Sequence, residues 1–119
     1  MGVLMKKIMV LMALLLSCQV ASSGYYTGND LKNWSEATDR IDQGRAREAD
    51  YTISSKIQGY VTGVSDTLDG YVFCVADGTT VKQLLAITSK YLVDHPSEWN
   101  YEASVLVTSA LRPVFPCKK

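Results

Sequence analysis

Apolar residues recur along this chain at the spacing of a helix face. The clearest stripe steps mostly by three or four residues, and its members are Ile53, Ile57, Tyr60, Val61, Val64 and Leu68. A stripe of this period predicts one amphipathic helix with a single buried side. Asp69 and Gly70 follow directly and predict its end, because Gly favours the backbone conformation that closes helices.

Three other segments carry the same period. The residues on one face are Leu31, Trp34, Ala37 and Ile41 in the first, Val81, Leu84, Leu85, Thr88, Tyr91 and Leu92 in the second, and Ala103, Leu106, Val107, Ala110 and Leu111 in the third. We expect the first of these helices to begin at Thr27 or Asn29 and to break in the polar segment 39–48. The last is expected to start near Glu98.

Capping chemistry and the lack of strand patterns complete the fold prediction. Thr80 and Gln83 have the spacing of a capping box, in which the Thr hydroxyl accepts from the Gln amide while the Gln side chain reaches back. No segment sustains the two-residue alternation of a strand, and residues 71–75 form only a short unbroken apolar run. The sequence therefore predicts an all-α fold, a small four-helix bundle.

The first 23 residues have the order of a secretory signal. Lys6 and Lys7 precede an apolar block of about ten residues, half of what a membrane span requires, and small residues follow. Residues 1–23 are therefore predicted to be a signal peptide and residues 24–119 a single helical domain. Cys18 leaves an alternative open, because residues 15–18 approximate a lipobox whose acylation would anchor the protein to a membrane. Cleavage near residue 22 or 23 is the preferred interpretation.

Cysteine usage agrees with export. The chain has three cysteines, and removal of Cys18 with the signal leaves Cys74 and Cys117 as a pair. In an oxidising compartment the two are expected to form a disulfide, which in the chain-entropy model stabilises the fold by about 4 kcal/mol. The pairing also predicts that the C-terminal tail folds back onto the loop before the third helix.

Charge and composition argue against several functions. Without residues 1–23 the domain has ten basic and twelve acidic residues, a formal charge of −2, and the basic residues are scattered. Nucleic acid is therefore a poor candidate partner. His95 is the only histidine and precedes Pro96, where a helix-capping role is more usual than catalysis. No metal-ligand set, cofactor motif or catalytic constellation can be assembled, so we expect neither enzyme activity nor a cofactor.

Two features suggest contact surfaces. Gly59 and Gly63 lie four residues apart in the second helix, where each costs about 1 kcal/mol unless the missing side chain allows a close approach. That approach could be an internal helix contact or a two-fold interface between copies. Trp99 and Tyr101 lie between the third and fourth helices, where large aromatics can anchor a partner. The alternative for Trp99 is that its ring packs over the end of the bundle.

Five segments together resemble the Rap/Tai immunity protein family. They are Thr27-Gly28-Asn29-Asp30-Leu31, Gly59-Tyr60-Val61-Thr62-Gly63-Val64, Thr80-Val81-Lys82-Gln83-Leu84, Tyr91-Leu92 with His95-Pro96, and Ala110-Leu111-Arg112-Pro113-Val114-Phe115-Pro116-Cys117. Each segment is weakly specific alone, but their order and spacing match over nearly all of the predicted mature chain. Similar sequences often carry a further cysteine pair, at the positions where this chain has Ser35 and Ile57, so one disulfide of the family is expected to be missing here.

The resemblance implies a periplasmic, all-helical and usually dimeric protein that neutralises a toxin delivered by type VI secretion, typically a peptidoglycan amidase. In such inhibitors a protruding loop fills the cleft of the enzyme. The candidate for that loop here is the connection containing Trp99, Asn100 and Tyr101. A small periplasmic stress protein or chaperone is the alternative function.

Overall fold

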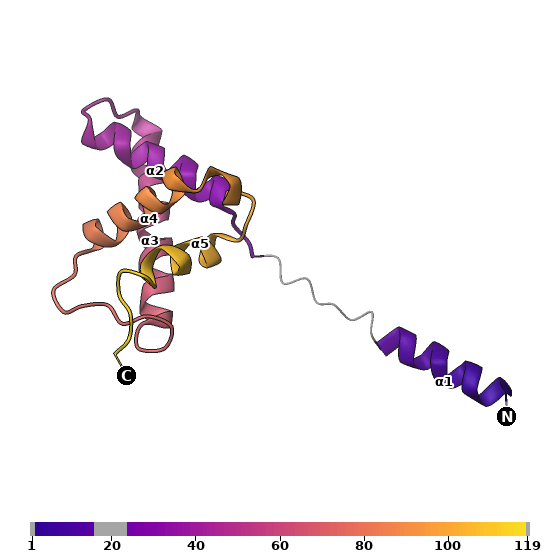
Figure 1. Ribbon diagram of the computed structural model, residues 1–119. Helices are drawn as coiled ribbons and strands as arrows, with labels where there is room; N and C mark the ends of the chain where they lie inside the picture. Colours follow the sequence, from indigo (N-terminus) through magenta and orange to yellow (C-terminus); the bar gives the residue numbers. More distant parts are fainter. Residues whose placement is uncertain (1, 16–23, 119) are drawn as a thin grey trace.

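A computed structural model describes residues 2–15 and 24–118 and shows only helices as regular elements within them. The elements are α1 (Gly2–Leu15), α2 (Gly28–Asp42), α3 (Glu48–Leu68), α4 (Val81–Asp94), the 3-10 turn η1 (Pro96–Glu98) and α5 (Ala103–Leu111). Helices α2 to α5 pack together (Figure 1), which confirms the predicted all-α domain.

Helix α1 falls within the segment predicted to be a signal peptide. None of the helices in the described ranges has the length and apolar character needed to cross a membrane. Cys18 and the predicted cleavage region lie outside the described residues. The predictions of a signal peptide and of its cleavage site therefore remain predictions.

The helix starts follow the capping residues of the sequence. Thr27 precedes α2, and its backbone N–H donates to the Asp30 carboxylate at 2.8 Å, so Thr27 is the cap rather than Asn29. At α4 the Gln83 N–H donates to the Thr80 hydroxyl at 3.2 Å, and the Thr80 N–H donates to the Gln83 side-chain oxygen at 2.7 Å. The predicted capping box is confirmed.

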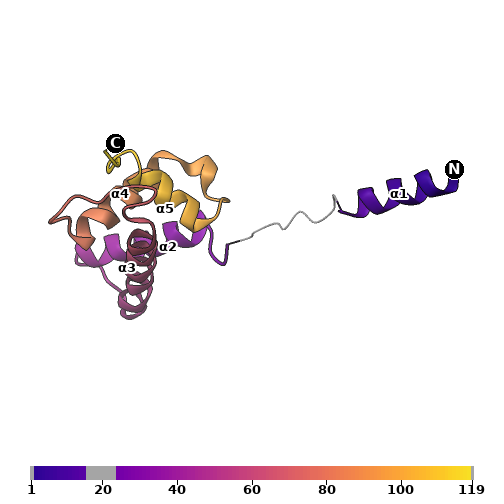
Figure 2. The ribbon, with the colours of Figure 1, turned by 90° about the horizontal axis from the view of Figure 1, so that it is seen from below.

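Helix α3 contacts α2, α4 and α5, and Figure 2 shows these three helices to one side of it. The predicted apolar faces meet in one core. The core residues are Leu31, Trp34, Ala37, Ile57, Val61, Phe73, Leu84, Leu85, Leu92, Ala103, Leu106, Val107, Ala110 and Leu111. Phe73 is fully buried although the sequence placed it in a connecting loop. This loop therefore forms part of the core.

An ion cluster around the buried Asp50 joins α2 to α3. Arg40 donates two hydrogen bonds to the Asp50 carboxylate, at 2.7 and 2.9 Å, and the Arg47 backbone N–H donates to the same group at 2.9 Å. The Asp50 side chain is fully buried. The Arg40 guanidinium, assisted by Arg47, holds the pKa of Asp50 well below its usual range, because these bonds favour the charged form.

The chain between these helices differs from the prediction in extent. The break expected within residues 39–48 begins later, because α2 continues to Asp42. Gly44, at a φ of 68°, then turns the chain toward α3, in a conformation that other residues rarely adopt.

The predicted disulfide between Cys74 and Cys117 is confirmed, with Cα atoms 4.8 Å apart. The Cys74 N–H also donates to the Phe115 carbonyl at 2.8 Å, and the Phe115 ring packs against the core. The C-terminal tail therefore folds back as predicted.

Ser35 and Ile57 occupy separate environments. The Ser35 hydroxyl lies 2.7 Å from the Ser89 hydroxyl of α4, so a hydrogen bond connects α2 to α4 there. Ile57 is buried in the core at 1% exposure. A polar bond at Ser35 and apolar packing at Ile57 therefore stabilise these two positions.

The expected start of the last helix near Glu98 is wrong. Residues 96–98 form a single 3-10 turn, and α5 begins only at Ala103. The carbonyls of Trp99 and Tyr101 accept from backbone amides at the start of α2. Because that contact holds the chain away from helical geometry, the α4–α5 connection is longer than the sequence indicates.

Candidate partner-binding site

The first turn of α2 holds the α4–α5 connection, residues 95–102. The Gly28 N–H donates to the Tyr101 carbonyl, and the Asn29 N–H donates to the Trp99 carbonyl, both at 2.9 Å. The first amides of a helix have no partner within the helix, so they are available for this contact. The Asn29 side chain adds bonds to the Trp99 carbonyl at 3.1 Å and to the Asn100 side-chain oxygen at 3.2 Å.

Gly28 is the position where two backbones approach closely. A Cβ atom there would lie 2.4 Å from the Leu106 Cδ1 atom and 2.7 Å from the Trp99 Cα atom. No real Cβ tolerates such distances without movement of its neighbours. A side chain at position 28 would therefore push the α4–α5 connection off the start of α2. Sequence reasoning missed this role, because Gly28 lies beside a cap and outside any recognised spacing.

Trp99 is half-buried and packs against the core. Its indole N–H donates to the Leu92 carbonyl near the end of α4 at 2.8 Å. The Lys32 ammonium lies 5.2 Å from the ring centroid, within cation–π range. Burial thus favours the packing alternative for Trp99 and gives its ring the role of fixing the connection to the bundle end.

The end of α4 fixes the other side of the connection. The Tyr91 hydroxyl donates to the Glu98 carboxylate at 2.7 Å, and this bond raises the pKa of Tyr91. His95 stacks on the Tyr91 ring with centroids 4.0 Å apart, and its Nδ1 lies 2.8 Å from the Tyr91 carbonyl. His95 is the C-terminal cap of α4, in agreement with the capping role predicted for it.

Asn100 and Tyr101 face outward from the connection, as do Pro96 and Ser97 earlier in it. Asn100 is exposed, and Tyr101 is 57% exposed. Their backbone is fixed on both sides by the bonds to α2 and by the Trp99 ring. The connection therefore presents an amide and a phenol on a rigid backbone, an arrangement suited to binding a protein surface.

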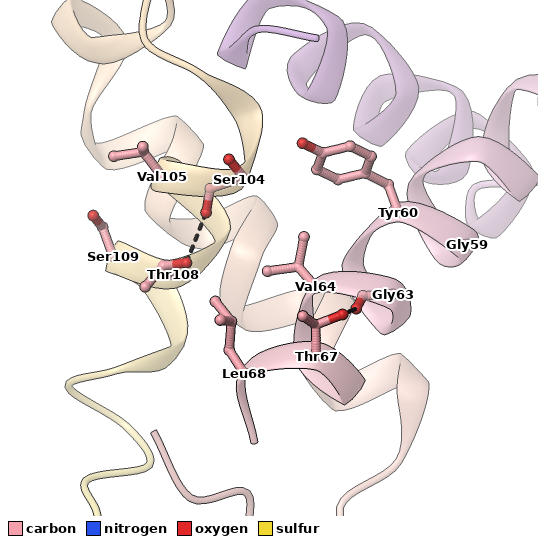
Figure 3. Close-up of a pocket in the computed structure, with 10 residues that line it drawn as sticks. All are labelled: Gly59, Tyr60, Gly63, Val64, Thr67, Leu68, Ser104, Val105, Thr108 and Ser109. Atoms are coloured by element: carbon pink, nitrogen blue, oxygen red, sulfur yellow. Dashed lines mark hydrogen bonds between the residues drawn. The ribbon is translucent and has the colours of Figure 1, made fainter. Parts of the chain in front are cut away.

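The predicted glycine pair lies elsewhere, in an open groove between α3 and α5. Figure 3 shows Tyr60 and Val64 of α3 pointing toward α5 across it. The groove has a volume of about 680 Å³ and is lined by Gly59, Tyr60, Gly63, Val64, Thr67, Leu68, Ser104, Val105, Thr108 and Ser109. A Cβ atom at Gly59 or Gly63 would meet nothing within 4 Å. The prediction of a close internal helix contact there is therefore wrong, while the two-fold interface stays a prediction.

The range of the chain that matches a known protein family coincides with the packed helical domain. The family model described as Rap1a immunity proteins matches residues 27–117. No curated protein matches the chain. The matched range begins at Thr27, the cap of α2, and ends at Cys117 of the disulfide. It thus contains the four packed helices and the α4–α5 connection.

Proposed function

Because this chain belongs to the Rap1a immunity protein family, we propose that it binds and occludes a toxin delivered by type VI secretion, with a peptidoglycan amidase as the target. An immunity protein of this kind acts by occupying a surface and carries out no chemistry. The observation that carries the proposal is the α4–α5 connection, which is fixed to α2 by hydrogen bonds and leaves Asn100 and Tyr101 exposed.

The rigidity of the connection matters energetically. Association costs free energy for each mobile segment that must become ordered, so a loop already fixed loses less on binding. Four backbone or side-chain bonds from Gly28 and Asn29 hold this one before any partner arrives. Tyrosine is enriched among the residues that dominate interface energies, because a large ring and a hydroxyl act together. Tyr101 is the residue we expect to contribute most.

Two features support a periplasmic place of action as part of the proposal. The disulfide between Cys74 and Cys117 is typical of oxidising compartments, and residues 1–23 have the order of an export signal. We therefore place the protein in the periplasm, where a cell-wall amidase would act. Lipid modification at Cys18 would add a membrane anchor without changing the domain. Two copies are proposed to form the working inhibitor.

Protection of cells tests the proposal. The full chain would be expressed together with a periplasm-directed amidase encoded beside it, and survival compared with cells that lack the chain. We expect the chain to restore growth and the purified proteins to form a stable complex. Binding of this enzyme alone, rather than of unfolded proteins in general, separates an immunity protein from the chaperone alternative. Unprotected cells, with both proteins present and folded, would contradict the proposal.

A substitution series locates the contact. Tyr101→Ala is expected to weaken the complex at least tenfold, which corresponds to about 1.4 kcal/mol or more. The matched control is Tyr71→Ala, in the other connection that flanks α4, where the ring is 86% exposed. We expect the control to leave affinity within about twofold of the original, well under 1 kcal/mol. A larger loss for Tyr71→Ala than for Tyr101→Ala would move the binding site to residues 71–79.

A further inference from the structure

Residues 24–27, which precede α2, pair with the end of the α4–α5 connection. Thr27 and Glu102 form an isolated antiparallel bridge. Beside it, the Tyr26 carbonyl accepts from the first amide of α5, and the first amide of α2 donates to the Tyr101 carbonyl, both at 2.9 Å. The 24–27 segment therefore holds the part of the connection that carries the proposed toxin contact.

Gly24 lies against the Glu102 side chain. A Cβ atom at Gly24 would lie 3.2 Å from the Glu102 Cγ atom and 3.3 Å from its carboxyl carbon, Cδ. The backbone nitrogen of a residue is about 2.5 Å from its own Cβ position, so the Gly24 nitrogen lies within about 6 Å of the carboxyl carbon. A positive charge on this nitrogen would therefore be close enough to stabilise the carboxylate.

The Glu102 carboxylate has no counter-ion in the part of the chain that the structure describes. It belongs to none of the ion pairs found there. Glu102 precedes α5 as its N-cap, but its side chain makes no capping hydrogen bond. The residue is half-buried, and a charge that is partly removed from water is stabilised by a partner of opposite sign. A cation at Gly24 would supply that partner.

The amide bond before Gly24 is also a suitable cleavage site. Ala21 and Ser23 are small residues three and one positions before it, which is the pattern that signal peptidases recognise. Hydrolysis there consumes one water molecule and leaves a carboxylate on Ser23 and an amino group on Gly24. Because free α-amino groups have a pKa of about 7.7–8.0, most of them carry a proton near neutral pH.

We propose that removal of residues 1–23 creates an ammonium group on Gly24, which pairs with the Glu102 carboxylate and fixes the 24–27 segment on the α4–α5 connection. In the uncleaved chain the same nitrogen is an uncharged amide and cannot form this ion pair. Export therefore completes the surface that carries Tyr101. The consequence for toxin binding rests on the proposed function, whereas the ion pair itself does not depend on it.

The first test is the identity of the exported chain. The full chain is expressed with residues 1–23, the product is purified from the periplasm, and its intact mass is measured. We expect a single species that begins at Gly24. A product that begins at another residue, or one that carries lipid on Cys18, would overturn the inference.

Hydrogen exchange of the exported protein tests the ion pair. Acetylation of the Gly24 amino group removes the positive charge, and Glu102→Gln removes the negative one. Each change should speed exchange of the amides of residues 28 and 103 by about twofold to fivefold, because an ion pair near the surface changes an equilibrium by about that factor. The two changes together should have no larger effect than either alone, since both remove the same pair.

Glu48→Gln is the matched control for the loss of a carboxylate at a helix start. Glu48 is exposed in the first turn of α3, and its substitution leaves Gly24 and Glu102 unchanged. We expect this control to leave exchange at residues 28 and 103 as it is in the original protein. Additive effects of acetylation and Glu102→Gln, or no effect of either, would overturn the inference.

Toxin affinity separates the inference from the proposed function. Acetylation and Glu102→Gln should each weaken the complex with the amidase by about twofold to fivefold, and Glu48→Gln should not. An unchanged affinity where exchange responds would overturn the link between export and the contact surface. The expected exchange pattern in a protein that binds no amidase would overturn the proposed function and leave the ion pair standing.

Discussion

Glycines at two places in this domain have opposite surroundings. At Gly28 the space for a side chain is already occupied by Leu106 and the Trp99 backbone, whereas at Gly59 and Gly63 it is empty. The first glycine allows the chain to pack against itself, and the other two keep a groove open. The contrast shows that glycine spacing along a helix indicates a surface suited to close contact, but not whether the same chain provides the contact.

The largest effect is expected at Gly28. Gly28→Ala forces Leu106 and the Trp99 backbone to move, and overpacking of this kind lowers the free energy of unfolding by about 2–3 kcal/mol. Urea denaturation measures the change, with Gly59→Ala as the matched control. Equal stability of Gly28→Ala and the original chain would show that the contact between α2 and the connection yields easily. In that case the α4–α5 connection could no longer be described as rigid.

Substitution of the groove glycines, Gly59 and Gly63, should raise the free energy of unfolding, in contrast to substitution at Gly28. Gly59→Ala and Gly63→Ala are expected to stabilise the isolated domain by about 1 kcal/mol each, because alanine favours helix and meets no neighbour. The denaturation should be followed at protein concentrations low enough to keep copies apart. Destabilisation by either substitution under those conditions would mean that the positions serve an internal contact after all.

A smaller effect is expected from the side chain of Asn29. Asn29→Ala removes the bonds to the Trp99 carbonyl and to Asn100 but keeps the backbone bond from residue 29. Because these groups are exposed, we expect a loss of about 0.5–1 kcal/mol in unfolding free energy. Toxin affinity should fall as well, since Asn100 becomes more mobile. A stability loss as large as that of Gly28→Ala would mean that the Asn29 side chain, and not the close backbone approach at Gly28, mainly holds the α4–α5 connection on α2.

The acid dependence of stability should not distinguish the glycine variants at all. The pKa of Asp50 lies below its usual range in the folded chain because of Arg40 and Arg47, so its stabilising contribution is complete above its unfolded pKa of about 3.9. That contribution is lost as the pH falls below this value. All glycine variants share the cluster and should lose stability in parallel, whereas Asp50→Asn should flatten the curve. Divergent curves among the glycine variants would contradict this.

Local signals explain what the sequence predicted well. Thr80 and Gln83 define the start of α4 through neighbours three residues apart, and the apolar stripe that ends at Leu68 defines α3. The pairing of Cys74 with Cys117 followed once Cys18 was assigned to the export signal. In each case the information lies within one segment or in a count of residues.

Contacts between distant segments explain the rest. The late start of α5 depends on bonds from the amides of Gly28 and Asn29, about seventy residues earlier in the chain. No pattern within residues 95–102 predicts those bonds. The burial of Phe73 likewise depends on how the loop folds over the core. The role of Asp50 likewise depends on Arg40 of another helix, which donates to its carboxylate. The candidate connection was found from its aromatics, but its rigidity was not.

Hydrogen exchange of the free and toxin-bound chain tests the central claim, that the α4–α5 connection is a preformed binding surface. The account predicts that amides in residues 95–102 exchange slowly in the free chain and more slowly still in the complex. Peptides from residues 71–79 should show no change on binding. Fast exchange of the connection in the free chain, or protection on binding that excludes residues 95–102, would contradict it.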